Sequence, residues 1–138
     1  MRTRVRFGET DAAGIVFYPT YFTWFDTGTH ELLRIGDAPA HGADGKPLHP
    51  MPLVECGATF LAPLQYDEPI EIHSTVAEIG ESSLRVEHEI RHNGKIAARG
   101  FEVHVYVRLV DGRIAKAPIP DDLRAHLAAP SESVVAAG

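Results

Sequence analysis

The feature that most constrains the fold is one long amphipathic helix that follows a first strand and precedes a run of antiparallel strands. Between Thr20 and Ile35, the larger apolar residues recur about every 3.6 positions, at Tyr21, Trp24, Phe25, Gly28, Leu32 and Ile35. Pro19 suits the first position of a helix, and Gly36 suits the position just after its end. Gly28 within the helix predicts a close packing contact. A lone helix can be covered here only by a sheet that curls around it, so we expect an α+β domain.

The strands are predicted from the alternation of apolar and polar residues, over residues 2–7, 53–61, 70–79, 84–92, 96–110 and 113–117. Asn93-Gly94 and Asp111-Gly112 predict tight hairpin turns. The alternation slips within residues 96–110, which predicts a β-bulge at Gly100. Residues 37–52 predict a loop, and residues 120–123 the start of a short terminal helix. Cys56 is expected to be a small buried residue of its strand.

Length and composition limit the remaining possibilities. A chain of 138 residues suits one domain, which we place at residues 1–127, with a frayed tail at 128–138. The net charge of −6 argues against a nucleic-acid partner, and no apolar run is long enough to span a membrane. The single cysteine and the scattered histidines form no metal-ligand pattern. We therefore expect a cytoplasmic protein without a metal or another cofactor.

Residues 5–21 carry the most specific motif, which reads VRFGETDAAGIVFYPTY. It combines an aromatic–Gly–acidic–x–Asp approach with the turn at Gly14, Ile15 and Val16, and Trp24-Phe25-Asp26 follows inside the helix. This combination resembles the hotdog-fold acyl-CoA thioesterases, and most closely the 4-hydroxybenzoyl-CoA thioesterase family. The resemblance implies an antiparallel sheet of about five strands wrapped around the long helix. It also implies a homodimer with a continuous sheet and sites between subunits, assembled further into a homotetramer.

The resemblance places the catalytic carboxylate on Asp11 and the oxyanion donor on the backbone N–H of Tyr18. General chemistry supports that pairing, because a helix N-terminus offers unpaired N–H groups and about half a positive charge to a developing oxyanion. Asp11 lies seven residues before Tyr18, across the Gly14 turn. It could attack the thioester carbonyl directly or act as a general base on water, and the sequence leaves both open. Glu9 is expected to be an exposed acid at the end of the first strand.

Further site residues follow from the same resemblance. Substrate contacts are expected at Gly14, Ile15, Val16, Tyr21, Asp26 and Thr59. Asp26 matches an acidic position near the family's acyl pocket, although a solvated helix residue fits it equally well. The run from Phe17 to Pro19 is similar to the branch that acts on aromatic acyl groups, which favours a substrate such as 4-hydroxybenzoyl-CoA. A short aliphatic acyl-CoA is the alternative.

The contact with the CoA phosphates departs from the family pattern. Relatives commonly carry basic residues in the turn that corresponds to residues 79–83, where this chain has Glu81. Arg85, Arg91, Arg99 or a residue of the partner subunit would have to supply the cation. This departure leaves room for an acyl-carrier-protein thioester as the substrate.

Two other kinds of protein share the predicted fold. A non-catalytic acyl-binding dimer would not need the Asp11 carboxylate beside a helix terminus. A hotdog dehydratase needs a histidine paired with an acid near the helix start, and His30 is too far along the helix. Because a chain of this length has little room for a private pocket, we expect a site that two subunits build together.

Overall fold

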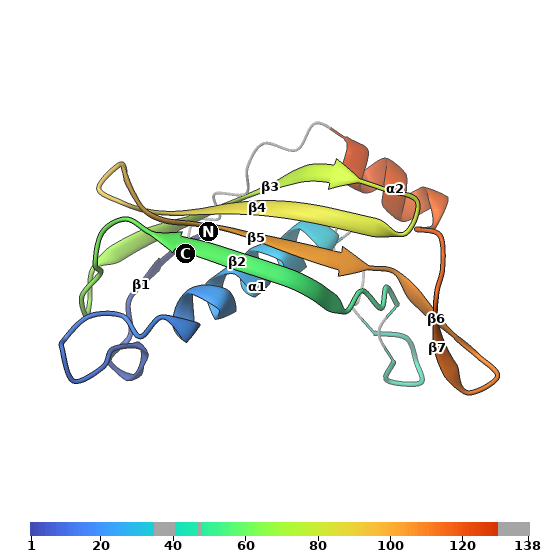
Figure 1. The fold of residues 1–138 in the computed structure, drawn as a ribbon, viewed down its shortest axis with the longest axis horizontal. Helices are drawn as coiled ribbons and strands as arrows, with labels where there is room; N and C mark the ends of the chain where they lie inside the picture. Colours follow the sequence, from blue (N-terminus) through green and yellow to red (C-terminus); the bar gives the residue numbers. More distant parts are fainter. Residues whose placement is uncertain (35–40, 47, 130–138) are drawn as a thin grey trace.

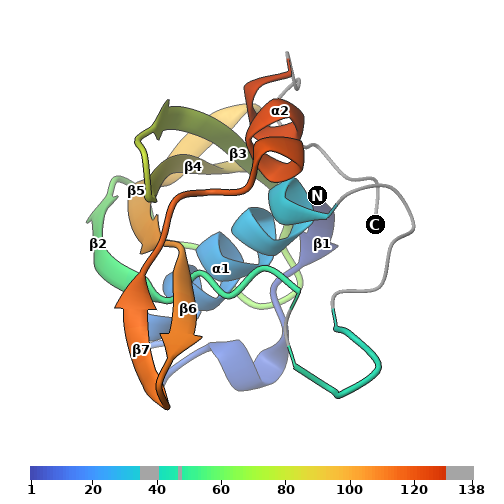
Figure 2. The same cartoon turned by 90° about the vertical axis from the view of Figure 1, so that its right-hand side faces the viewer.

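A curved antiparallel sheet holds one long helix in its concave face (Figure 1). The computed structural model describes residues 1–34, 41–46 and 48–129. The helix is α1 (Pro19–Leu33), and the sheet order is β1-β3-β4-β5-β2. The strands are β1 (Arg2–Arg4), β2 (Leu53–Phe60), β3 (Pro69–Ile79), β4 (Ser83–His92) and β5 (Lys95–Val105). Seen along the helix, the sheet curls from β3 round to β2, which confirms the predicted hotdog fold (Figure 2).

Smaller elements complete the described chain. A 3-10 turn, η1 (Phe7–Glu9), precedes the motif loop, and α2 (Asp121–Ala128) packs beside the end of β3. β6 (Val107–Val110) and β7 (Arg113–Lys116) form a separate two-stranded ribbon. Both predicted hairpin turns are present, with positive φ angles of 50° and 75° at Asn93 and Gly94, and 51° and 75° at Asp111 and Gly112.

Two glycines allow α1 to lie close against the sheet. A Cβ at Gly28 would overlap the Ser74 hydroxyl, and a Cβ at Gly100 would overlap the Phe25 ring. The close contact predicted at Gly28 is therefore confirmed. Around it, apolar residues of the helix pack against those of the strands, so the core lies between α1 and the sheet, with Phe25 fully buried.

The first strand and the predicted bulge differ from expectation. β1 ends at Arg4 because the chain turns into η1, and Phe7 is 77% exposed rather than half-buried. The register shift in β5 lies beside Ala97, between the partners of Ile90 and Arg91. Gly100 stays in regular register, and its missing side chain makes room for Phe25 instead of forming a bulge.

Two further expectations are corrected at the open side of the sheet. The strand predicted over residues 96–110 is interrupted at Tyr106, whose N–H donates to the Ser82 carbonyl 2.7 Å away. Cys56 is exposed rather than buried, because β2 is the last strand of the sheet. The predicted helix end at Gly36 and residues 130–138 of the predicted tail lie outside the described residues. None of the helices described is long and apolar enough to cross a membrane.

Candidate active site

The loop that carries Asp11 is tied down by its own hydrogen bonds. The Asp11 N–H donates to the Ile15 carbonyl at 2.9 Å, and the Gly14 N–H donates to the Asp11 carbonyl at 3.0 Å. The Asp11 carboxylate accepts from the Ala13 N–H at 2.8 Å. Gly14 has φ of +78°, which glycine adopts without the cost that a Cβ would bring. These hydrogen bonds hold the Asp11 carboxylate in a fixed turn. Because Asp11 is exposed, its carboxylate remains open to solvent.

The start of α1 offers one free donor beside this loop. Pro19 has no N–H, and the N–H groups of Thr20 and Tyr21 donate to the carbonyls of Phe17 and Tyr18 at 2.9 and 3.2 Å. Within the described part of the chain, the Tyr18 N–H donates to no acceptor. The positive end of the helix dipole lies at the same place. An anionic oxygen could therefore bind at the helix start.

Glu9 holds the motif loop against the helix. Its carboxylate accepts from the indole N–H of Trp24 at 3.0 Å and from the Arg6 N–H at 2.7 Å. Its carbonyl accepts from the Phe17 N–H at 2.9 Å. Glu9 is half-buried, which corrects the expectation of an exposed acid. The bond from the Arg6 N–H to the Glu9 carboxylate corresponds to the glutamate half of a capping box, because Glu9 lies three residues after the residue that precedes η1.

An apolar depression of about 370 Å³ opens next to Tyr18. It is lined by Ile15, Val16, Tyr18, Tyr21, Phe60, Leu61, Ala62 and Pro63. Three of the predicted substrate contacts, Ile15, Val16 and Tyr21, therefore meet beside Tyr18 at the helix start. Burial, with a contribution from nearby Glu68, raises the pKa of Tyr21, so its phenol stays neutral at pH 7. Phe17, Tyr18, Phe60 and Leu61 are about half exposed, which leaves one side of the depression open.

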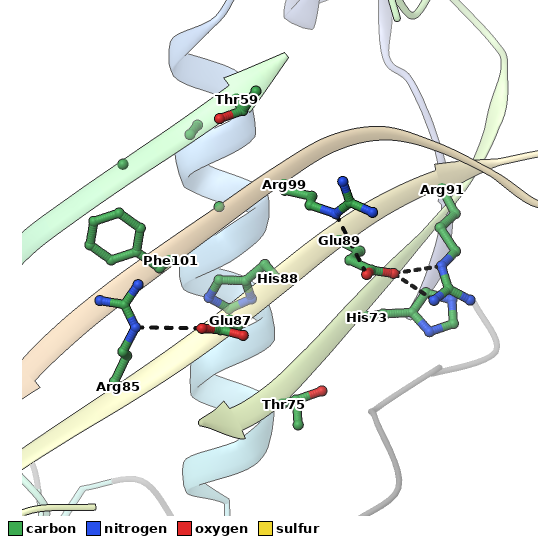
Figure 3. A pocket seen from close by; sticks show the side chains of 13 residues that line it. Thr59, His73, Thr75, Arg85, Glu87, His88, Glu89, Arg91, Arg99 and Phe101 are labelled. Atoms are coloured by element: carbon green, nitrogen blue, oxygen red, sulfur yellow. Dashed lines mark hydrogen bonds and ion pairs between the residues drawn. The ribbon is translucent and has the colours of Figure 1, made fainter. Parts of the chain in front are cut away.

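Thr59 and the three predicted phosphate-binding arginines lie elsewhere, on the outer face of the sheet (Figure 3). They line an open hollow of about 700 Å³. Arg85 pairs with Glu87 at 3.5 Å, and Glu89 pairs with both Arg91 and Arg99. The Arg85 guanidinium also lies 4.1 Å from the centre of the Phe101 ring. Because carboxylates offset these cations, the hollow is not a strongly positive site.

A buried polar network lies beneath the C-terminal half of α1. Glu102 of β5 accepts hydrogen bonds from Thr29 at 2.5 Å and from His88 at 3.0 Å. Ser74 lies 2.7 Å from the other nitrogen of His88, and the Phe25 ring stacks on the His88 imidazole. Burial alone would raise the pKa of Glu102, but its contacts with His104, His88 and Thr29 outweigh burial and lower the pKa to about 2. Glu102 is therefore ionised at neutral pH.

Asp26 lies at the open edge of this network rather than in the apolar depression. One ligand atom each of Asp26, Glu102 and His104 fall within 4.8 Å of one another, and they form the one such trio in the described parts of the chain. The His104 Nδ1–H donates to the Met51 carbonyl, and its buried Nε2 lies 3.7 Å from a Glu102 carboxylate oxygen, which is an ion-pair distance and too long for a hydrogen bond. Burial lowers the pKa of His104, but its contacts with Glu102, Met51 and Asp26 outweigh burial and raise the pKa above the usual value for histidine.

A five-stranded antiparallel sheet wrapped around one long helix defines a hotdog-fold protein. Comparison with known proteins identifies the family. The sequence profile of the thioesterase-like superfamily matches residues 5–127. The chain therefore belongs to the thioesterase-like superfamily. Several of its relatives are named thioesterases or CoA hydrolases, and its enzyme class is thioester hydrolase.

Individual relatives support this placement. A 1,4-dihydroxy-2-naphthoyl-CoA hydrolase of Synechococcus sp. (strain RCC307) is 33% identical over 91% of this chain and 97% of its own. A 4-hydroxybenzoyl-CoA thioesterase of Pseudomonas sp. (strain CBS-3) is 25% identical over 88% of this chain and 92% of its own. A solved gentisyl-coenzyme A thioesterase has a TM-score of 0.77 and 33% identity, covering 93% of this chain and 98% of its own.

Proposed function

We propose that this chain hydrolyses acyl-CoA thioesters with an aromatic acyl group, releasing the free acid and CoA. The observation that carries the proposal is the free Tyr18 N–H, which lies at the helix start beside an apolar depression and a fixed Asp11 loop. The relatives named above act on dihydroxynaphthoyl, hydroxybenzoyl and gentisyl thioesters, all of which are hydroxylated aromatic groups. The depression is lined with Tyr18, Tyr21 and Phe60, which suits a flat aromatic ring.

In the proposed mechanism, the acyl group lies in the depression and its carbonyl oxygen points at the Tyr18 N–H. Asp11 attacks the carbonyl carbon or removes a proton from a water that attacks it. Either path places negative charge on the carbonyl oxygen, where the Tyr18 N–H and the helix dipole stabilise it. Collapse of this intermediate breaks the C–S bond and releases the CoA thiolate. If Asp11 is the nucleophile, water then hydrolyses the resulting acyl-aspartyl anhydride.

The substrate class can be tested by measuring thiol release from a panel of thioesters. We expect 4-hydroxybenzoyl-, 1,4-dihydroxy-2-naphthoyl- and gentisyl-CoA to be cleaved with higher kcat/KM than acetyl- or hexanoyl-CoA. An acyl-carrier-protein thioester carrying the same aromatic group serves as the comparison for the carrier. Faster cleavage of the aliphatic substrates would contradict the aromatic assignment. Saturable binding of all of them without thiol release would favour an acyl-binding protein instead.

The phosphates of the CoA nucleotide need a cationic contact on the protein. Arg85, Arg91 and Arg99 stay candidates for contacting its phosphates, with Glu87 and Glu89 competing for them. Substituting each arginine by Gln should raise KM for the CoA thioester and leave KM for a pantetheine thioester unchanged. Equal effects on both substrates would contradict a phosphate contact.

A further inference from the structure

The two edges of the sheet differ in how they are protected. β1 is three residues long and carries Arg2 and Arg4, two features that discourage pairing with another strand. β2 is eight residues long, and Glu55 is its only charged residue. Leu53, Val54 and Phe60 of β2 are 46%, 60% and 47% exposed. The β2 edge is therefore the one open to a second strand, and its apolar side chains favour a second copy of this chain.

The β6–β7 hairpin extends away from the sheet near the same edge (Figures 1 and 2). Leu109 and Ile114 are cross-strand partners on one face of the hairpin and are 62% and 71% exposed. The opposite face carries Arg108 and Arg113. Four residues at about 3.3 Å each extend each strand by roughly 13 Å, which exceeds two strand spacings. The hairpin is long enough to reach over a neighbouring subunit.

Symmetry determines where the hairpin of a second copy would lie. Two identical edge strands that pair antiparallel are related by a two-fold axis, so the Leu53 end of one β2 lies beside the Phe60 end of the other. The hairpin is at the Leu53 end, because the Val105 N–H donates to the Pro52 carbonyl at 3.1 Å. The apolar depression with Tyr18 and Leu61 is at the Phe60 end. The pairing therefore carries the partner's hairpin to the depression.

We propose that the β6–β7 hairpin of each subunit completes the site of the other, with Leu109 and Ile114 closing the open side of the depression. This inference rests on the function proposed above and adds the residues that the second copy contributes. It accounts for two exposed apolar surfaces at once, the hairpin face and the half-open depression. Covering one with the other removes both from water.

Charge favours the same contact. The hairpin carries Arg108, Arg113 and Lys116 against a single acid at its tip, Asp111. In the described part of the chain, none of these three cations forms an ion pair. The receiving loop carries Glu9 and Asp11. The cationic hairpin is therefore attracted to the acidic motif.

A subunit-mixing experiment tests the proposal. The variant Leu109→Glu/Ile114→Thr should lose at least about tenfold in kcat/KM, whereas Lys95→Gln, which makes the same charge change on another hairpin, should not. Asp11→Asn removes the proposed carboxylate from the other half of the site. In a mixed dimer of the two variants, one site combines an intact Asp11 with an intact hairpin. Random mixing should therefore restore about a quarter of wild-type activity.

The outcomes separate the hairpin from the proposed function. Mixed dimers detected by native mass spectrometry without activity above the sum of the parents would overturn the hairpin inference. Full activity of the Asp11→Asn homodimer would instead overturn the role of Asp11 and leave the hairpin to an activity-independent test. That test places Ile114→Cys and Leu61→Cys in a Cys56→Ser chain. A disulfide-linked dimer on a non-reducing gel, absent from either single cysteine, supports the inference, and absence of that dimer contradicts it.

Discussion

The two ends of α1 carry polar groups in opposite environments. At its N-terminus, Asp11 and Tyr18 are exposed, and the Tyr18 N–H donates to no acceptor in the described chain. Under its C-terminal half, Thr29, His88 and Glu102 are each at least 98% buried and hydrogen-bonded to one another. The strongly lowered pKa belongs to buried Glu102, not to the motif carboxylate that the mechanism uses.

This contrast separates groups that fix the fold from groups that can react. A substrate has no access to the buried network of Thr29, His88 and Glu102. The hydrogen bonds within this network are already formed, so the network sets how α1 sits on the sheet. In the motif, the Asp11 carboxylate and the Tyr18 N–H can still form hydrogen bonds, because their proposed partners are the substrate and a second subunit. A perturbed pKa is here a sign of packing.

Asp11→Asn should lower kcat/KM for an aromatic acyl-CoA by about 10²–10⁴-fold, since the amide can neither attack nor accept a proton. The fold should be unaffected, because the Asn oxygen can still accept the Ala13 N–H that the carboxylate holds at 2.8 Å. Thiol-release kinetics and thermal melts of both proteins check this. A large loss of melting temperature together with the loss of activity would place Asp11 among the structural residues.

Glu102→Ala should show the reverse pattern. Removing one member of a buried charged pair leaves its partners without an acceptor, which typically costs about 3–5 kcal/mol of unfolding free energy. Activity per folded molecule should stay close to that of the wild type. Denaturant unfolding and active-site-normalised kinetics measure the two effects. Glu102→Gln, which still accepts from Thr29, is the milder control.

Gly28→Ala tests how tightly the helix is seated above the network. The added Cβ overlaps the Ser74 hydroxyl and approaches His88 to 3.2 Å, so overpacking should cost about 1–3 kcal/mol. Ser74→Ala in the same chain removes the hydroxyl and should recover part of the loss. Equal stabilities of the single and double variants would show that the helix shifts instead.

The network should also give the protein a characteristic pH range of stability. Glu102 has a pKa lowered from 4.5 to about 2, so its stabilisation is complete above pH 4.5 and is lost as the pH falls toward 2. His104 has a pKa raised above 6.5, so its contribution is complete below 6.5 and is lost as the pH rises through the folded value. The stability difference between wild type and a Glu102→Gln/His104→Gln chain should therefore be largest between pH 4.5 and 6.5. A difference independent of pH would contradict the charge assignment.

The same division explains what the sequence could predict. Helix periodicity and the Asn93-Gly94 and Asp111-Gly112 turns act locally, so the wrapped helix and its hairpins were predictable. The motif likewise located the loop and helix start. The network was not predicted, because His88, Glu102 and Thr29 come from three elements that only tertiary packing brings together. The β-bulge predicted at Gly100 lies beside Ala97 instead. The change in the apolar alternation could not show that Gly100 makes room for the Phe25 ring, which comes from a distant part of the chain.

A small effect is expected from removing the Tyr18 hydroxyl, because the proposed contribution of Tyr18 is its backbone N–H. Its side chain is largely exposed, so Tyr18→Phe should keep kcat within about threefold of the wild type. Tyr18→Pro removes the N–H, and the φ of −54° at this position is compatible with proline. Compared with Tyr18→Ala, it should lose a further 10²–10³-fold, about the effect of removing one oxyanion donor. A thousandfold fall in kcat for Tyr18→Phe would assign the chemistry to the phenol and transfer the oxyanion role to another donor.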